Sequence, residues 1–130
     1  PVEEFVDLVF HQIKINKIEN RTTIQSFDDE ALIITHNKYP SIKTVLLIED
    51  TIGIKTHLEK IGFNPYAYSP YFKLVNQELV NYCHANNIKI IPWTVNDEIN
   101  VKELINLKVD GIISDFPDMV LKVLKEKNKK

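Results

Sequence analysis

Residues 90–96, Ile-Ile-Pro-Trp-Thr-Val-Asn, decide the fold, because an apolar run ends there in an indole, a hydroxyl and a carboxamide. Residues 110–117, Asp-Gly-Ile-Ile-Ser-Asp-Phe-Pro, follow the same design after a segment long enough for one helix. Two strands with polar carboxyl ends, joined by a helix, are typical of a parallel sheet whose ligand site lies along one edge. The fold class predicted from this pair is therefore α/β.

The remaining sequence continues this alternation of helix and strand. The run 44–48, Thr-Val-Leu-Leu-Ile, is apolar without alternation, as in strands that are covered on both faces. Helix signals precede and follow each apolar run. Asp28 and Asn100 are expected to cap helices at their N-termini, and Gly62 is expected to cap one helix at its C-terminus. We predict strands at 22–27, 44–48, 66–68, 89–95 and 111–114, and helices at 3–16, 29–39, 55–61, 71–85, 100–108 and 117–126.

Composition limits the size and class of the protein. The 130 residues are enough for one domain, whereas a complete (β/α)₈ barrel takes about 250 residues. The net charge of −2 gives no electrostatic reason to bind nucleic acid. No apolar run is long enough for a transmembrane segment. The lone Cys83 excludes an internal disulfide and is expected to be buried on a helix face.

Polar and aromatic side chains follow each predicted strand, where ligands bind in parallel α/β folds. Trp93 stands out, because packing alone explains poorly a single tryptophan beside Thr94 and Asn96. The carboxylates keep structural alternatives as helix caps or turn residues. The candidate positions are Gln25, Ser26, Phe27, Asp28, Glu49, Asp50, Ser69, Trp93, Thr94, Asn96, Asp97, Ser114 and Asp115.

Other kinds of site have little support in the sequence. The four histidines, His11, His36, His57 and His84, lie in predicted helices or at their ends and form no triad or metal-ligand pair, so we expect surface or packing roles. Three glycines leave no room for a Gly-rich phosphate loop. The strand-end set therefore suits a polar small molecule with some apolar body.

Three motifs in order resemble the C-terminal half of the glycerophosphodiester phosphodiesterase family. Residues 26–28 correspond to its Ser-Phe-Asp, 93–96 to its Trp-Thr-Val-Asn, and 110–117 to its Asp-Gly-Ile-Ile-Thr-Asp-x-Pro motif. Ser114 replaces the usual threonine and keeps the hydroxyl. The resemblance extends from about residue 3 to residue 124. It implies the C-terminal part, about five strands, of a TIM-type (β/α)₈ barrel, with residues 1–130 forming a single partial domain.

The resemblance also implies a function. Members of this family hydrolyse glycerophosphodiesters, which are lipid-derived, to an alcohol and glycerol 3-phosphate, with a divalent cation (Ca²⁺ or Mg²⁺) and two histidines as acid and base. By correspondence with the motifs, Phe27 and Trp93 would line the substrate pocket. Gln25, Ser26, Thr94 and Asn96 would lie at its rim, where they would orient the substrate or support the residues around the metal. Asp115 would be the family's final acidic residue.

The catalytic motifs of the family do not occur in these 130 residues. The sequence contains no H-R-G, E-N-T, E-x-D, H-D or E-x-K. The resemblance therefore assigns no catalytic residue and no metal ligand to this chain, which we expect to be inactive alone and to bind no cation. Because it begins at Pro1 without a methionine, we expect a truncated or processed start, and localisation stays open.

Three hypotheses remain from the sequence. The chain could be the C-terminal part of a phosphodiesterase, a non-catalytic half-barrel that binds a related ligand or a protein, or a compact open-sheet domain. A partial barrel would leave strand edges open. The first two hypotheses therefore predict association with the missing N-terminal half or with a homodimer partner.

Overall fold

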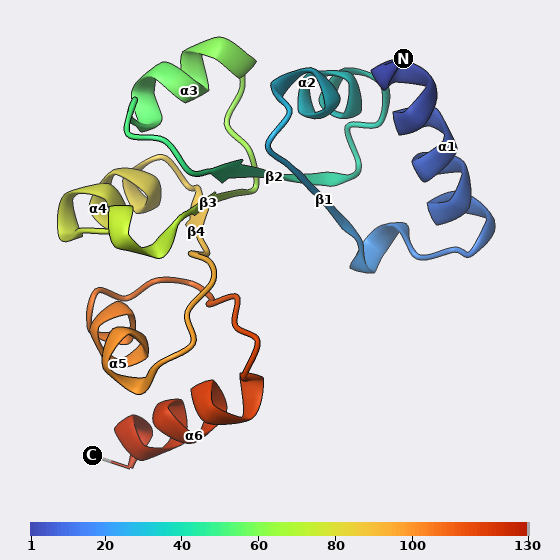
Figure 1. The fold of residues 1–130 in the computed structure, drawn as a ribbon. Coiled ribbons are helices and arrows are strands. Elements are labelled where there is room, and N and C mark those ends of the chain that lie inside the picture. The colour runs from blue at the N-terminus through green and yellow to red at the C-terminus, as the bar shows by residue number, and fades with distance from the viewer. Residues whose placement is uncertain (130) are drawn as a thin grey trace. The chain divides into compact units, whose positions relative to one another are not determined.

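The computed structural model describes residues 1–129, which alternate helices with short parallel strands and so confirm the α/β class (Figure 1). The chain divides into two compact units, residues 1–66 and the part from Ala67 onward. The elements are α1 (Val2–Ile15), η1 (Glu19–Arg21), β1 (Thr23–Ser26), α2 (Asp29–Lys38), β2 (Lys43–Ile48), α3 (Ile54–Ile61), β3 (Ala67–Pro70), η2 (Phe72–Leu74), α4 (Gln77–Ala85), β4 (Lys89–Ile90), α5 (Glu98–Asn106) and α6 (Pro117–Asn128).

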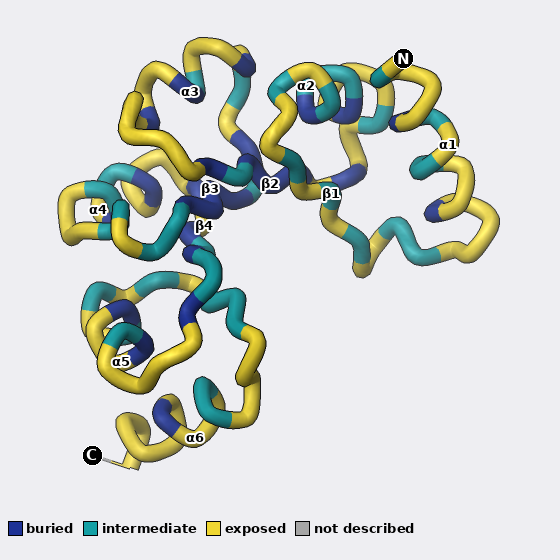
Figure 2. Tube along the Cα trace, viewed as in Figure 1, coloured by how far each residue is buried: buried dark blue, intermediate teal, exposed yellow. Residues whose placement is uncertain are grey.

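The N-terminal unit is built on the parallel pair β1 and β2, in register from Thr23 opposite Lys43 to Ser26 opposite Leu46. Most of β2 is buried, as its unbroken apolar run predicts, and Figure 2 shows it largely in dark blue. Helix α2 begins at the predicted cap, where the Asp28 carboxylate accepts a hydrogen bond from the Glu30 amide at 2.9 Å. Helix α3 ends at Gly62, whose φ of 79° confirms the predicted left-handed cap.

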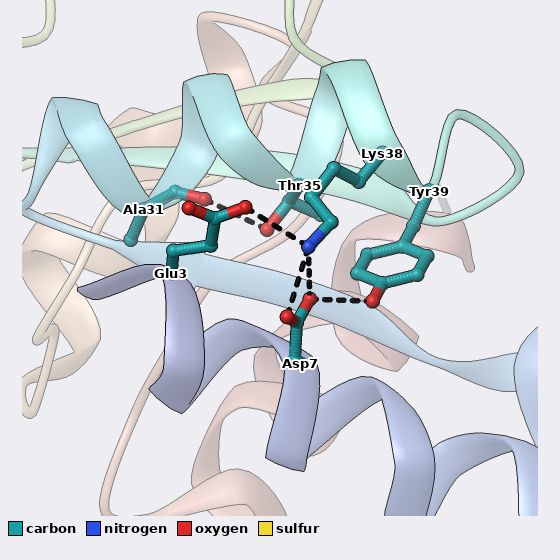
Figure 3. Close-up of polar contacts among 6 residues, drawn as sticks. All are labelled: Glu3, Asp7, Ala31, Thr35, Lys38 and Tyr39. Carbon is teal, nitrogen blue, oxygen red and sulfur yellow. Dashed lines mark hydrogen bonds and ion pairs between the residues drawn. The ribbon is translucent and has the colours of Figure 1, made fainter. Parts of the chain in front are cut away.

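A polar cluster joins α1 to α2 on the surface of this unit (Figure 3). The Lys38 ammonium lies 3.0 Å from Glu3 Oε1 and 2.7 Å from Asp7 Oδ1. The Tyr39 hydroxyl donates to the same Asp7 carboxylate at 2.5 Å. Hydrogen bonds from Lys38 and Tyr39 lower the pKa of Asp7, and the bond to Asp7 raises the pKa of Tyr39. The Phe10 and Tyr39 rings stack with centroids 3.7 Å apart, which adds an apolar contact beside the charges.

The C-terminal unit is built on β3 and β4, which pair in parallel with Ala67 opposite Lys89. Its core includes the completely buried Val95 and Val101, together with residues of α5 and α6. Pro117 opens α6 in the first turn, as predicted. Cys83 on α4 is also completely buried, and burial raises the pKa of its thiol to about 12, with a smaller contribution from the charge of Asp110.

Two predicted helix starts in this unit were wrong. The expected helix at 71–85 is a 3₁₀ turn, η2, followed by extended Val75, and α4 begins only after the Asn76 cap, whose side chain accepts from the Leu79 amide. The expected Asn100 cap is also incorrect. Asp97 caps α5 instead and accepts from the Asn100 amide at 2.9 Å, so Asn100 lies inside the first turn.

The two last predicted strands are less regular than expected. Strand β4 covers only Lys89–Ile90, and residues 111–114 form no assigned strand, so the described part of the chain has four strands where five were predicted. Pro92 has no N–H and interrupts the regular ladder. Three backbone hydrogen bonds of 2.9 Å nevertheless join the two segments: Asp110 N to Ile90 O, Ile113 N to Pro92 O, and Val95 N to Ile113 O.

Candidate functional site

Trp93 lies beyond the carboxyl end of β4, and its position is fixed by β3. The Trp93 amide donates to the Pro70 carbonyl at 3.1 Å, and Trp93 forms a parallel bridge with Tyr71. Its indole Nε1–H donates to the backbone oxygen of buried Ser69 at 2.9 Å. An indole has one donor and no acceptor. The ring of Trp93 is thus available to a ligand only as an apolar or π surface.

Two aromatic side chains beside Trp93 were missed by the sequence reasoning. The Tyr71 ring lies 5.7 Å from that of Trp93, centroid to centroid, and 5.0 Å from that of Phe72. All three side chains are partly exposed. The signal was present, because Tyr71 directly follows Ser69-Pro70, the strand end already identified as a candidate.

Asn96 connects two segments that are distant in sequence. Its carboxamide oxygen accepts from the Asp115 amide at 3.0 Å and from the Ser114 hydroxyl at 3.3 Å, and its amide nitrogen donates to Asp115 Oδ2 at 2.9 Å. The Ser114 hydroxyl also accepts from the Phe116 amide at 3.0 Å. Both ends of the Asn96 amide are therefore used in holding the 114–116 turn.

The other predicted residues of this segment differ in their surroundings. Thr94 is half-buried between Trp93 and the completely buried Val95. Asp97 is the α5 cap described above, and its hydrogen bonds from the Asn100 side chain and amide lower its pKa. A capping role accounts for the Asp97 carboxylate.

In the N-terminal unit, the predicted residues follow β1. The Ser26 hydroxyl accepts from the Asp28 amide at 2.9 Å, which forms the turn that leads into α2. Gln25 is exposed, and 54% of the Phe27 surface is exposed, a large fraction for a phenylalanine. Phe27 and Gln25 are thus presented to solvent at the end of β1, where ligands bind in parallel folds.

A second polar contact of this unit, Asp50 with His57, follows β2. The His57 Nε2 atom lies 2.8 Å from Asp50 Oδ1, which also accepts from the Ile52 amide at 3.0 Å. The pairing of Asp50 with a buried histidine was not predicted, since the six intervening positions show no motif for it.

Metal ligands do not cluster in the part of the chain that the structure describes. Residues 1–129 contain no group of three or more histidine, cysteine or acidic side chains placed to hold a metal ion. No helix among them combines the length and the apolar character needed to cross a membrane.

Comparison with known proteins decides the family. The sequence profile described as the glycerophosphoryl diester phosphodiesterase family matches residues 3–119. The chain belongs to this family. A glycerophosphodiester phosphodiesterase from Bacillus altitudinis is 34% identical over 119 residues, which cover 91% of this chain and 49% of that protein. The chain thus spans about half the length of curated relatives that it matches.

Solved structures of phosphodiesterases show the same fold. A candidate glycerophosphoryl diester phosphodiesterase from Silicibacter pomeroyi matches 97% of this chain and 45% of its own, with a TM-score of 0.88 and 25% identity. A glycerophosphodiester phosphodiesterase from Parabacteroides distasonis matches 98% of this chain and 52% of its own, with a TM-score of 0.85 and 22% identity. The prediction of part of a TIM-type barrel is confirmed.

Proposed function

We propose that this chain forms the substrate-contacting C-terminal part of a metal-dependent phosphodiesterase, which hydrolyses glycerophosphodiesters to an alcohol and glycerol 3-phosphate. The match to the family over residues 3–119 supports the reaction class. The observation that carries the assignment of roles is the bonding of Trp93 and Asn96. The indole N–H of Trp93 is already bonded, so Trp93 offers a ligand its ring surface. The carboxamide of Asn96 is also bonded, so Asn96 holds the 114–116 turn.

Substrate contacts are proposed for each unit by itself. In the C-terminal unit, Trp93 contacts an apolar part of the substrate, such as the glycerol carbons, Thr94 orients its oxygens, and Asn96 acts by positioning Ser114 and Asp115. In the N-terminal unit, Phe27 contacts an apolar part of the substrate, and Gln25 and Ser26 orient its hydroxyl and phosphoryl oxygens.

We assign the bond-breaking groups to residues outside this sequence. The H-R-G, E-x-D and E-x-K motifs are missing from the 130 residues, and the described acidic and histidine side chains form no three-ligand group. We therefore place no Ca²⁺ or Mg²⁺ site on this chain and derive no metal step from it. The chain alone is expected to be catalytically inactive.

The first experiment tests activity and binding separately. The 130-residue chain is incubated with glycerophosphocholine and Ca²⁺ or Mg²⁺, and release of glycerol 3-phosphate is measured against metal alone. We expect no turnover above that background. Addition of the Bacillus altitudinis segment that this chain does not match should restore turnover. Failure of the wild-type pair, with both parts folded and associated, would contradict the proposed function.

The role of Trp93 is tested in the restored enzyme. Trp93→Ala should reduce kcat/KM at least tenfold, whereas Trp93→Phe, which keeps a ring, should retain most of it. Leu121→Ala is the control, because Leu121 is 56% exposed on α6 and belongs neither to a candidate site nor to helix α1. Equal activity in all three variants would rule out substrate contact by Trp93.

We further propose that the chain associates with the missing N-terminal half of the barrel. Helix α1 exposes Phe5, Leu8 and Ile15, whose spacing of three and seven residues places them along one stripe. Such a stripe fits a neighbouring helix. The alternative is a homodimer partner, and with it a non-catalytic binding module. Sedimentation of the chain alone and with the unmatched segment distinguishes the two alternatives. Association with the missing half gives a heterodimer with that segment, whereas the homodimer forms from the chain alone.

A further inference from the structure

His57 is a buried histidine that the proposed reaction does not use. It lies on the apolar face of α3, between Ile54 and Ile61, and only 4% of it is exposed. A buried polar side chain usually has hydrogen bonds for all of its polar atoms. His57 departs from this rule, because its Nδ1 atom finds no hydrogen-bond partner among residues 1–129.

The protonation of His57 follows from its one contact. Asp50 Oδ1 accepts from the Ile52 amide at 3.0 Å, and His57 Nε2 lies 2.8 Å from the same oxygen. The Ile52 amide and, to a lesser extent, His57 lower the pKa of Asp50, so its carboxylate is ionised and can only accept. His57 Nε2 must then be the donor in this contact, which leaves Nδ1 as the buried atom without a hydrogen-bond partner among the described residues.

This contact lies in the loop at the carboxyl end of β2. Residues 49–53 connect the carboxyl end of β2 to α3, and Gly53 turns the chain with a φ of 102°. Asp50 receives a bond from inside the loop, through Ile52, and one from the helix that follows, through His57. The side chain of a buried residue is thereby tied to the backbone of an exposed turn.

We propose that His57, donating from Nε2 to Asp50, is a positioning residue that holds the 49–53 loop in the shape that the ligand meets. The inference rests on the proposed function, because that function makes the carboxyl ends of the strands the ligand side. His57 does not touch the reacting atoms in this scheme. It acts through Asp50.

Three substitutions at position 57 test the positioning role of the His57–Asp50 contact in the complete 130-residue chain. His57→Gln places an amide donor near the Nε2 position, His57→Asn places one near Nδ1, and His57→Leu has none. Hydrogen exchange of the Ile52 amide should be at least tenfold faster in the Leu and Asn variants and return to near wild type in the Gln variant. Equal exchange in all variants, or uniformly faster exchange throughout the unit, would overturn the proposal.

Two further measurements test the hydrogen bond of His57 and its effect on ligand binding. Nitrogen NMR of His57 should show a protonated Nε2, and an Nε2 without a proton would overturn the proposal. The Kd of sn-glycerol 3-phosphate, from isothermal titration, should rise several-fold in the Leu and Asn variants and recover in the Gln variant. An unchanged Kd in all three variants would overturn the positioning role. The wild-type chain could bind no sn-glycerol 3-phosphate while exchange of the Ile52 amide changes in the variants as expected. In that case the proposed function fails, and the hold of His57 on the loop is supported.

Discussion

The two candidate segments are held in place by different kinds of contact. After β4, Trp93 and Asn96 bind partners that lie 24 and 19 residues away in the sequence. After β1, Ser26 and Asp28 take part in hydrogen bonds that span only two residues. The first segment therefore depends on the folding of its whole unit, whereas the second is a local turn. Substitutions in the first should propagate widely, and those in the second should stay local.

The largest effect is expected from Trp93→Phe. The variant keeps a ring but removes the Nε1–H donor from the carbonyl of buried Ser69, which should destabilise the chain by about 2 kcal/mol. Urea unfolding followed by circular dichroism measures the change. Phe5→Leu, at an exposed position, is the control and should change stability by less than about 0.5 kcal/mol. Equal stability of the two variants would mean that the indole bond contributes nothing.

Asn96→Ala should come next. It removes the bonds that the carboxamide makes with Ser114 and Asp115, at an expected cost of about 1–2 kcal/mol. Hydrogen exchange at the Asp115 amide should accelerate in parallel. Asn64→Ala, at an exposed asparagine of the other unit, is the matched control. An unchanged Asp115 amide would break the proposed link between the two segments.

Asp28→Ala tests the local segment. Loss of the cap should cost about 1 kcal/mol and increase fraying of the first turn of α2. Asp29→Ala, one residue inside the helix, should have a smaller effect because it is not the cap. Amide exchange resolved by residue should place the change in α2 alone. A disturbance that reached residues 93–96 would contradict the distinction between the two segments.

The smallest effect is expected from Asp7→Asn in the α1–α2 cluster, because its charges are exposed and screened. The folded-state pKa of Asp7 is lowered, so its contribution is present above the unfolded pKa and is lost as the pH falls through the folded value. The folded-state pKa of Tyr39 is raised, so its contribution to stability is lost as the pH rises through that pKa. Stability of the wild type should thus decline at both extremes and with added salt, and the Asn variant should depend less on acid and salt.

Local signals in the sequence identified several elements correctly. The Asp28 cap, the Gly62 cap and Pro117 in the first turn of α6 depend on side-chain chemistry within a few residues, so a single sequence carries them. The Asn100 cap was wrong because Asp97, three residues earlier, caps the helix and accepts from the Asn100 amide, which places Asn100 inside the first turn. The predicted helix did not begin at residue 71 because the backbone there pairs with Trp93. Tyr71 forms a parallel bridge with Trp93, and the Phe72 amide donates to the Trp93 carbonyl.

The details of the candidate site were less accessible. Motifs predicted roles for Trp93 and Asn96, and these roles stay predictions. Their partners could not be predicted, because the Ser69 carbonyl and the 114–116 turn come close only after β3 and β4 have paired. The contact between Asp50 and His57 likewise depends on how α3 packs. Assignment of Gln25, Ser26, Phe27, Trp93 and Thr94 to substrate contact stays a prediction.

The buried thiol of Cys83 is a natural probe of local opening in the C-terminal unit. With no exposed surface and a pKa raised to about 12, the sulfur is protected from alkylating reagents twice, by access and by chemistry. Modification can then proceed only when α4 separates from its neighbours. Because the sequence contains a single cysteine, the rate of alkylation reads how often this one region opens, without any engineered label.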